Sequence, residues 1–347
     1  MKLFVTGSNG FIGGRIAELA GQRPDVYPVC GYRQSKGVVR IARIPLEMAH
    51  CDISSKDSLR DSIESDVDVL VHCASGAPGT LASGCRNVAE VAAEKKIKKL
   101  IFLSSVDVYG NQEGELTERS ERQETKSWYT CEKIAAEQLL ESMSGAIDEI
   151  IILRPSIVYG PFCVPWLIRY YERASLGNGL QIPDAFNGNC NLVYVDDLVN
   201  LILDVAGKKL GTGVHVYNVN GPEVLKWNDY FKFLEGIMGY EGGAAGTQRD
   251  GFLKASIRKV AKYGLKHHRE RINWLRLNLP YGKKVFGSVE AGLRKSFDDV
   301  EAAVYQRCPI YKIEKAKVEL QYHPKTSVQQ GIGYCDDYLK FYHTQWR

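Results

Sequence analysis

The chain has 347 residues, of which 44% are apolar and 25% are charged, with 33 Gly and 12 Pro. These values are close to those of average soluble globular proteins and exclude a disordered, collagen-like or fibrous chain. Because the chain exceeds the size at which a single core stops growing, we expect a large domain with a smaller companion lobe. The first residues lack the pattern of a signal peptide, and no stretch approaches the roughly 20 apolar residues of a transmembrane segment.

The nine cysteines are scattered and show no CxxC or Cys/His ligand spacing. We therefore expect a cytoplasmic protein without a metal site. The net charge is only +4, but residues 254–284 hold ten Lys or Arg and one acid. This basic segment is interpreted as a solvated helix face, a contact for a phosphate-bearing substrate, or a contact with an anionic membrane surface. We do not expect a nucleic-acid partner.

Strand-like and helical patterns alternate along the first half of the chain. An apolar strand over 2–6 precedes a helical pattern from Phe11 to Leu19. Alternation of this kind predicts βαβ units and a parallel sheet. Further elements are expected as strands at 26–30, 67–73, 99–104, 149–153 and 214–219 and as helices at 81–94 and 196–205.

A glycine turn, TGSNGFIG, lies between the first strand and the first helix. Its three glycines are three residues apart, the spacing that lets a backbone turn approach the pyrophosphate of a dinucleotide at a helix amino terminus. The sequence therefore predicts an α/β Rossmann fold with a doubly wound parallel sheet. The expected cofactor contacts of this turn are Gly7, Asn9, Gly10, Phe11, Ile12 and Gly13.

We place the dinucleotide-binding domain at 1–160, with 190–220 returning to its sheet. A smaller, mainly helical substrate lobe is expected at 161–189 and 221–330, and a carboxyl-terminal tail at 331–347.

The end of the second strand carries no acid that could hold the ribose hydroxyls of NAD. Arg33 follows that strand instead and could pair with a 2′-phosphate, which favours NADP, with NAD as the alternative. The other interpretation is that Arg33 stacks on adenine or points into water. Asp52 and Ile53 are further expected cofactor contacts, and Asp52 could accept from the adenine amino group or begin a helix as an N-terminal acid.

Tyr129 and Lys133 are four residues apart in a helical pattern, so their side chains lie on one face. An ammonium group near a phenol lowers its pKa, which suits Tyr129 to general acid/base catalysis on a hydroxyl or carbonyl. Ser105 ends the fourth of these predicted strands, at the sheet edge where ligands bind in such folds, and could donate to the same oxygen. The three residues form the candidate catalytic triad.

With these motifs, and with HCAS, SSVDVYG, LRPSIVYGP and LVYVDDL, the chain resembles the extended short-chain dehydrogenase/reductase family of nucleotide-sugar epimerases, dehydratases and ketoreductases. The resemblance implies that Ser105, Tyr129 and Lys133 are catalytic and that the protein is a homodimer. It also implies cofactor contacts from Ala74, Ser104, Tyr129, Lys133 and the backbone near Pro155.

Departures from the family pattern narrow the expected reaction. Val106 and Asp107 stand where related dehydratases carry two acids, so elimination of water is not expected. Asp107 is a candidate substrate contact or a turn-capping loop residue. Ile157 and Val158 replace an asparagine that contacts the sugar diphosphate in many members, and Asn191 is a candidate substitute.

The sequence thus predicts an NADP-dependent oxidoreductase acting at a ketone or secondary alcohol. Its expected substrate position is C4 of a nucleotide sugar, as a 4-ketoreductase or 4-epimerase in polysaccharide or glycoside biosynthesis. One alternative is reduction of a non-sugar ketone, as in the flavonol and sterol branches of the family. Another is a non-catalytic dinucleotide-binding sensor or scaffold, since a fold does not fix a function.

Overall fold

The computed structural model describes residues 1–175, 179–239 and 299–346. They cluster into two compact units. Unit 1 contains 1–163, 191–224 and 309–331, and unit 2 contains the described residues of 164–190, 225–308 and 332–347. The basic segment 254–284 lies outside the described residues.

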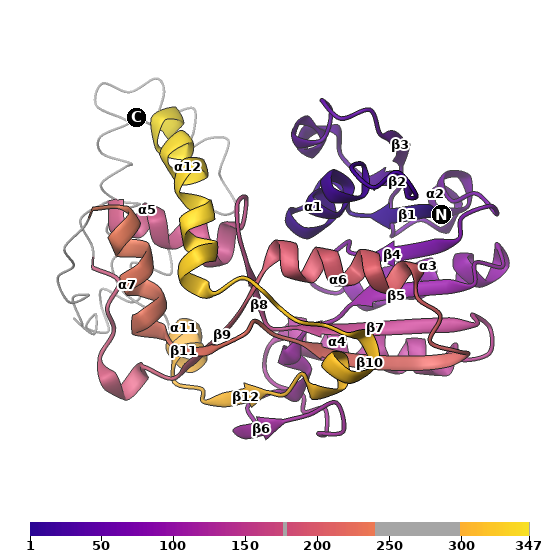
Figure 1. Cartoon of the computed structure of the whole chain (residues 1–347). Coiled ribbons are helices and arrows are strands. Elements are labelled where there is room, and N and C mark those ends of the chain that lie inside the picture. The colour runs from indigo at the N-terminus through magenta and orange to yellow at the C-terminus, as the bar shows by residue number, and fades with distance from the viewer. Residues whose placement is uncertain (176–178, 240–298, 347) are drawn as a thin grey trace. The chain divides into compact units, whose positions relative to one another are not determined.

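Seven strands form the central sheet of unit 1: β1 Lys2–Thr6, β2 Tyr27–Tyr32, β3 Glu47–His50, β4 Val69–His72, β5 Lys99–Leu103, β7 Glu149–Pro155 and β10 Gly213–Val219. They pair in parallel in the order β10-β7-β5-β4-β1-β2-β3 (Figure 1). The registers place Thr6 beside His72 and Leu103 beside Leu153. Strands β4, β5 and β7 are buried along their whole length, as in a parallel sheet covered on both faces.

Helices cover both faces of this sheet. The chain moves from β1 to β2 in one direction and from β4 to β5 in the other, so right-handed crossovers place the connecting helices on opposite faces. On one face α1 Phe11–Ala20 packs against α6 Val195–Gly207, and on the other α2 Lys56–Ser62, α3 Leu81–Glu94 and α4 Trp128–Ser142 pack in succession. The core beneath α3 and α4 joins Val88 and Leu140 to Phe102 and Ile150.

Apart from α7 and α12, the remaining elements among the described residues are short. In or at the edges of unit 1 they are η1 Ser35–Arg40, η2 Val106–Tyr109, β6 Gly114–Leu116, β8 Ile157–Tyr159, β9 Asn189–Tyr194, β11 Val224–Lys226, β12 Pro309–Tyr311 and η5 Ala316–Leu320. In unit 2 they are a π-helical turn Val164–Ile168, α5 Arg169–Ser175, η4 Asp184–Phe186, α7 Trp227–Ile237, α11 Asp299–Tyr305 and α12 Val328–Trp346, which begins in unit 1. Unit 2 is built around aromatic contacts, such as Trp227 against Tyr305 with ring centroids 4.7 Å apart.

The predicted α/β fold is confirmed, and each predicted strand and helix is present within two residues of its expected ends. Residues 309–330 differ from expectation, because we assigned them to the lobe and they belong to unit 1. The reason is long-range pairing: β12 pairs with β6, and the Tyr322 hydroxyl donates to the Asn220 carbonyl at 3.0 Å. The expected tail from residue 331 is helical as part of α12.

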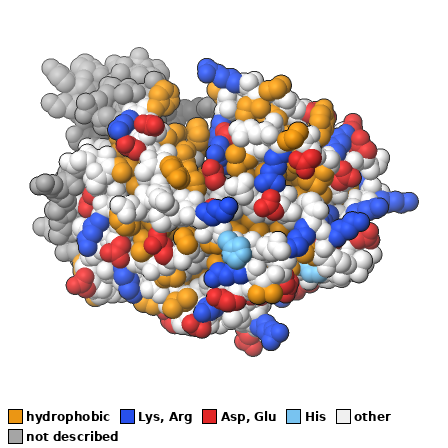
Figure 2. Space-filling model, in the orientation of Figure 1, with side chains coloured by type: hydrophobic (Ala, Val, Ile, Leu, Met, Phe, Trp, Pro, Cys, Tyr) orange, Lys and Arg blue, Asp and Glu red, His pale blue; other side chains and the backbone are white. Residues whose placement is uncertain are grey.

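Acidic and basic side chains are interspersed over the described residues on the face shown in Figure 2. None of the described helices has the length and apolar character needed to cross a membrane.

Candidate functional site

The glycine turn after β1 is closely packed against the end of β4. Gly7 has φ +72°, and a Cβ atom there would lie 2.8 Å from the Cα of Ala74. A Cβ at Gly13 would lie 2.3 Å from the Gly7 carbonyl oxygen, which accepts from the Gly10 N–H at 2.9 Å. Side chains at Gly7 and Gly13 would collide with this backbone, so glycine lets the turn pack closely at the α1 amino terminus, whose N-cap is Gly10. The turn therefore leaves backbone N–H groups open to an anionic ligand, as a dinucleotide pyrophosphate requires.

A cavity of about 360 Å³ opens at this turn. It has the size of a small-molecule site. Nine of the residues expected at the cofactor line it, namely Gly7, Asn9, Gly10, Phe11, Ile12, Gly13, Arg33, Ile53 and Ala74. Four that we did not predict complete the lining: Gln34, Cys51, Cys73 and Ser75. They directly follow or flank strand ends, a position from which the sequence could have indicated them.

Arg33 and Asp52 lie near each other beside this cavity. Arg33 is exposed and lines the cavity. The Asp52 carboxylate accepts from the Ser54 N–H at 2.9 Å and from its hydroxyl at 2.8 Å. The backbone bond from Ser54 lowers the pKa of Asp52, and the charge of Arg33 lowers it further. Helix α2 begins later, with Ser55 as its N-cap, so Asp52 does not begin that helix.

The structure brings the three candidate catalytic residues together. Ser105 ends the segment after β5, where its hydroxyl accepts from the Asp107 N–H at 3.1 Å. Tyr129 lies in the first turn of α4 and Lys133 in the next. The Lys133 ammonium is buried, donates to the Leu103 carbonyl and lies 5.5 Å from the centre of the Tyr129 ring. The Ser105 side chain lies near enough to the Tyr129 phenol to lower its pKa.

The pKa of Tyr129 differs from what we expected from the sequence. We expected the Lys133 ammonium to lower the pKa of Tyr129. Instead, burial raises the pKa of Tyr129 to about 12, the Asp107 carboxylate adds to the rise, and Ser105 partly offsets it. Burial also lowers the pKa of Lys133 to about 8, against the opposing effects of Cys85, Cys73 and Glu137. Without ligands, both groups hold their protons at neutral pH.

Three other expected contacts are committed to internal structure. The Ser104 hydroxyl is buried and donates to Glu137 at 2.5 Å. Pro155 is buried at the end of β7, where it pairs with β10. Asn191, the expected substitute contact for a sugar diphosphate, is 3% exposed, and its amide donates to the Pro309 carbonyl at 3.0 Å and accepts from Asn220 at 3.3 Å. The Ser104 and Asn191 side chains are therefore used in internal hydrogen bonds, and Pro155 lies inside the sheet.

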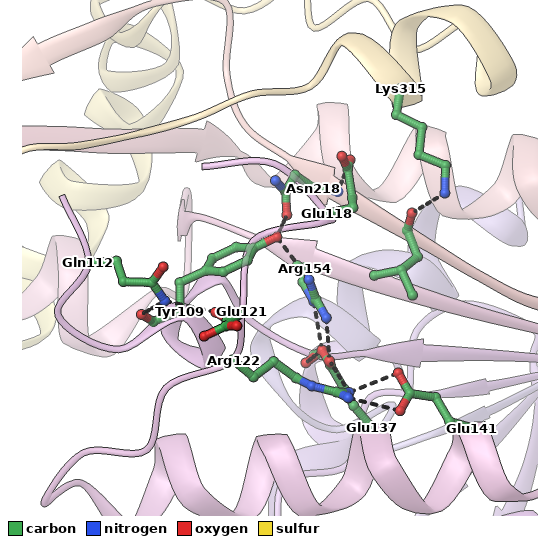
Figure 3. A network of polar contacts seen from close by, with 12 residues as sticks. Tyr109, Gln112, Glu118, Glu121, Arg122, Glu137, Glu141, Arg154, Asn218 and Lys315 are labelled. Atoms are coloured by element: carbon green, nitrogen blue, oxygen red, sulfur yellow. Dashed lines mark hydrogen bonds and ion pairs between the residues drawn. The ribbon is translucent and has the colours of Figure 1, made fainter. Parts of the chain in front are cut away.

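A buried polar network that we did not predict surrounds Glu137, one turn of α4 beyond Lys133 (Figure 3). Glu137 pairs with Arg154, and Arg154 donates to the Tyr109 hydroxyl at 2.9 Å. The spacing of Tyr129, Lys133 and Glu137, four residues apart each time, is the signal that could have indicated Glu137.

The family follows from comparison with known proteins. Residues 3–220 match the model of the NAD dependent epimerase/dehydratase family. The chain belongs to this family. The match agrees with the resemblance to extended short-chain dehydrogenases/reductases found in the sequence, and it makes a nicotinamide dinucleotide the cofactor class of the site.

Relatives in this family include epimerases and dehydratases. UDP-glucose 4-epimerase of Vibrio cholerae is 27% identical over 221 residues, which are 58% of this chain and 65% of that protein. The match therefore spans slightly less than two thirds of that relative. dTDP-D-glucose 4,6-dehydratase of Homo sapiens is 29% identical over 147 residues, 39% of each chain.

Solved structures share the fold over nearly the whole chain. UDP-glucuronic acid 4-epimerase from Bacillus cereus in complex with NAD has a TM-score of 0.72 at 21% identity, covering 98% of this chain and 99% of that one. UDP-glucose 4-epimerase from Thermotoga maritima with UDP-glucose has a TM-score of 0.73 at 21% identity, covering 99% and 100%.

Proposed function

We propose that this chain is a nucleotide-sugar 4-epimerase that uses a nicotinamide dinucleotide. The observation that carries the proposal is the convergence of Ser105, Tyr129 and Lys133 at the carboxyl end of β5, in the same unit as the dinucleotide cavity. Epimerases among the relatives and structural neighbours support it. Val106 next to Ser105 is a buried hydrocarbon side chain, which argues against a dehydratase because elimination needs an added acid and base there.

The proposed roles follow from the chemistry of each side chain. The bound nicotinamide would supply hydride acceptance and return at C4 of the sugar. Tyr129 would hold or take the proton of the C4 oxygen, and Ser105 would donate a hydrogen bond to that oxygen. Lys133 would favour the phenolate when Tyr129 loses its proton and would bind ribose hydroxyls. The glycine turn would hold the pyrophosphate through backbone N–H groups.

A second candidate function is an NADP-dependent 4-ketoreductase, and Arg33 favours it. Its guanidinium lines the dinucleotide cavity, and it is suited to a bidentate contact with a 2′-phosphate. The nearby Arg40 is held by Glu18, with Nε–Oε1 and Nη2–Oε2 distances of 2.6 and 2.9 Å. We therefore assign any preference for NADP to Arg33. Homodimerisation, a cytoplasmic location and a role in polysaccharide or glycoside synthesis stay predictions.

The test is turnover of UDP-glucose, UDP-galactose and UDP-glucuronic acid by the purified protein and by its Tyr129→Phe variant. We expect the variant to fold, to bind cofactor and to lose about a hundredfold or more in kcat, the usual scale of general acid/base catalysis. Tyr27→Phe, at an exposed tyrosine of the same unit, is the matched control. Parental turnover by Tyr129→Phe would refute the proposed chemistry.

Cofactor behaviour separates the two candidate functions. An epimerase recycles its nicotinamide and needs no added reductant, whereas a ketoreductase consumes NADPH in proportion to product. We expect Arg33→Asp to weaken NADPH binding more than NADH binding in a fluorescence titration. Equal effects on the two cofactors would remove the argument for NADP.

A further inference from the structure

Helix α4 presents three polar side chains at four-residue spacing toward the end of β5. Tyr129 lies at the first turn, Lys133 at the second and Glu137 at the third. The Lys133 ammonium donates to the Leu103 carbonyl, and the Glu137 carboxylate accepts from the Ser104 hydroxyl at 2.5 Å. Two successive turns of the helix are thus fastened to two successive residues of the segment that leads into Ser105.

The Glu137 carboxylate is fully buried and accepts from three side chains. Arg154, on β7, donates to both of its oxygens at 3.0 and 2.7 Å, and Arg122 approaches at 3.3 Å (Figure 3). Arg154 also donates to Tyr109, whose hydroxyl donates to Asn218 at 2.6 Å. The network therefore links α4 to the end of β5 and to β7, η2 and β10.

A buried carboxylate is costly unless it is fully paired, and removing its partner is strongly destabilising. Here the pairing fixes the rotation of α4 about its axis and its height above the sheet. Those two coordinates set the distance between the Tyr129 and Ser105 hydroxyls. Misplacement of a catalytic group by about 1 Å lowers a rate by roughly a hundredfold.

We propose that Glu137 is a positioning residue that holds Tyr129 and Lys133 in register with Ser105. The inference rests on the proposed function, because it assigns Glu137 a role in that same site. Glu137 also supplies negative charge to the buried Lys133 ammonium. Among the described residues, the other titratable groups near Lys133 are the Cys73 and Cys85 thiols and His72 from the β4 and α3 side and Tyr129 from its own helix.

The test compares Glu137→Gln with Glu141→Gln in the complete holoenzyme. Glu141 lies one turn further along α4, shares Arg122 as a partner at 2.9 Å and is partly exposed, so it is a matched control. In Glu137→Gln an amide NH2 group would face the Arg154 donors. We expect kcat to fall about tenfold to a hundredfold with KM within about twofold of the parent, and Glu141→Gln to keep parental kinetics.

The pH profile gives a second readout that a purely structural role would not move. Loss of the Glu137 charge should shift the alkaline limit of kcat to lower pH, because the protonated form of Lys133 loses support. Ser104→Ala removes one hydrogen bond to Glu137 but keeps the ion pair between Glu137 and Arg154. It therefore tests the positioning role even if Glu137→Gln does not fold. We expect it to lower kcat about fivefold, and parental kcat in a folded Ser104→Ala variant would overturn the proposal.

A measurement without substrate separates this inference from the proposed function. The protein is labelled with 3-fluorotyrosine, and the fluorine NMR resonance of Tyr129 is assigned with Tyr129→Phe. We expect this resonance to move in Ser104→Ala and Glu137→Gln and to stay in place in Glu141→Gln. An unmoved resonance overturns the inference. If the resonance moves but the parent protein turns over no nucleotide sugar, the positioning role of Glu137 is upheld and the proposed epimerase function is refuted.

Discussion

Replacing Gly13 by alanine tests how closely the glycine turn must pack to hold a dinucleotide. The added methyl group would lie 2.3 Å from the Gly7 carbonyl oxygen, whereas ordinary contacts begin at 3.4 Å. The turn must therefore open by roughly 1 Å, at a typical overpacking cost of about 1–3 kcal/mol. Alanine gains up to about 1 kcal/mol of helix propensity. We expect a net loss of up to about 2 kcal/mol in the free energy of unfolding.

The same displacement moves the N–H groups proposed to bind the pyrophosphate, so we expect at least about a tenfold loss of cofactor affinity, or 1.4 kcal/mol. Denaturant unfolding and fluorescence titration with NADH and NADPH measure the two effects. Gly14→Ala is the control, because it adds the same methyl group to the next residue of α1, where the nearest atoms lie at 3.2 and 3.3 Å. Parental stability and affinity in Gly13→Ala would refute the steric argument.

Two further variants test buried charge and helix capping. Burial lowers the pKa of Lys133 from 10.5 to about 8, so the unfolded chain binds more protons between these values and parental stability rises with pH there. Lys133→Met should therefore be more stable than the parent at pH 7, by at most roughly 3 kcal/mol. Denaturant unfolding should show that this difference in stability shrinks above pH 8. A difference that stays constant with pH would contradict the argument from burial of the ammonium. The Glu132 carboxylate accepts from the N–H groups of Leu81 at 2.6 Å and Ala82 at 3.1 Å, at the start of α3, whose N-cap Thr80 makes no side-chain capping bond to the helix. Glu132→Ala should lower the free energy of unfolding by about 1–2 kcal/mol, and an unchanged thermal transition would show that water replaces the cap.

The dinucleotide-binding half could be predicted because its signals are local. The strand and helix periods specify each element from adjacent residues, and the close packing at Gly7 and Gly13 favours glycine at both positions. The end of the lobe could not be placed in this way. Residues 309–331 join unit 1 through β12, which pairs with a strand almost 200 residues earlier. Such pairing leaves no mark within a short window of sequence.

In the candidate site, too, features set by neighbouring residues could be predicted, and features set by packing between distant segments could not. The four-residue spacing of Tyr129 and Lys133 correctly predicted one helix face. It could not show that Lys133 bonds the Leu103 carbonyl or that burial dominates the proton affinity of Tyr129, because both depend on how α4 lies over β5. The commitment of Asn191 to Pro309 and Asn220 likewise depends on a chain segment distant in sequence.

Experiment can assign Asp107 to one of three roles, because besides the two interpretations from the sequence, a substrate contact or a turn-capping residue, its carboxylate raises the pKa of Tyr129. Tyr129 must lose its proton to act as a base, and lowering its pKa from about 12 to neutrality requires about 7 kcal/mol from bound ligands and neighbours. The Asp107 carboxylate opposes this ionisation, while the Asp107 backbone N–H donates to Ser105. Asp107→Asn removes the charge and keeps the backbone bond, so it isolates the electrostatic effect.

If Asp107 acts only on Tyr129, Asp107→Asn lowers the pKa of the phenol. The acid limb of the kcat/KM profile then moves to lower pH, and activity below that limb's parental midpoint rises. If Asp107 contacts the sugar, KM rises at every pH and the limb stays in place. We expect the first result, because the carboxylate is close enough to raise the pKa of Tyr129 in the absence of any substrate. A profile unchanged in position and height would contradict both roles and leave Asp107 with the turn alone.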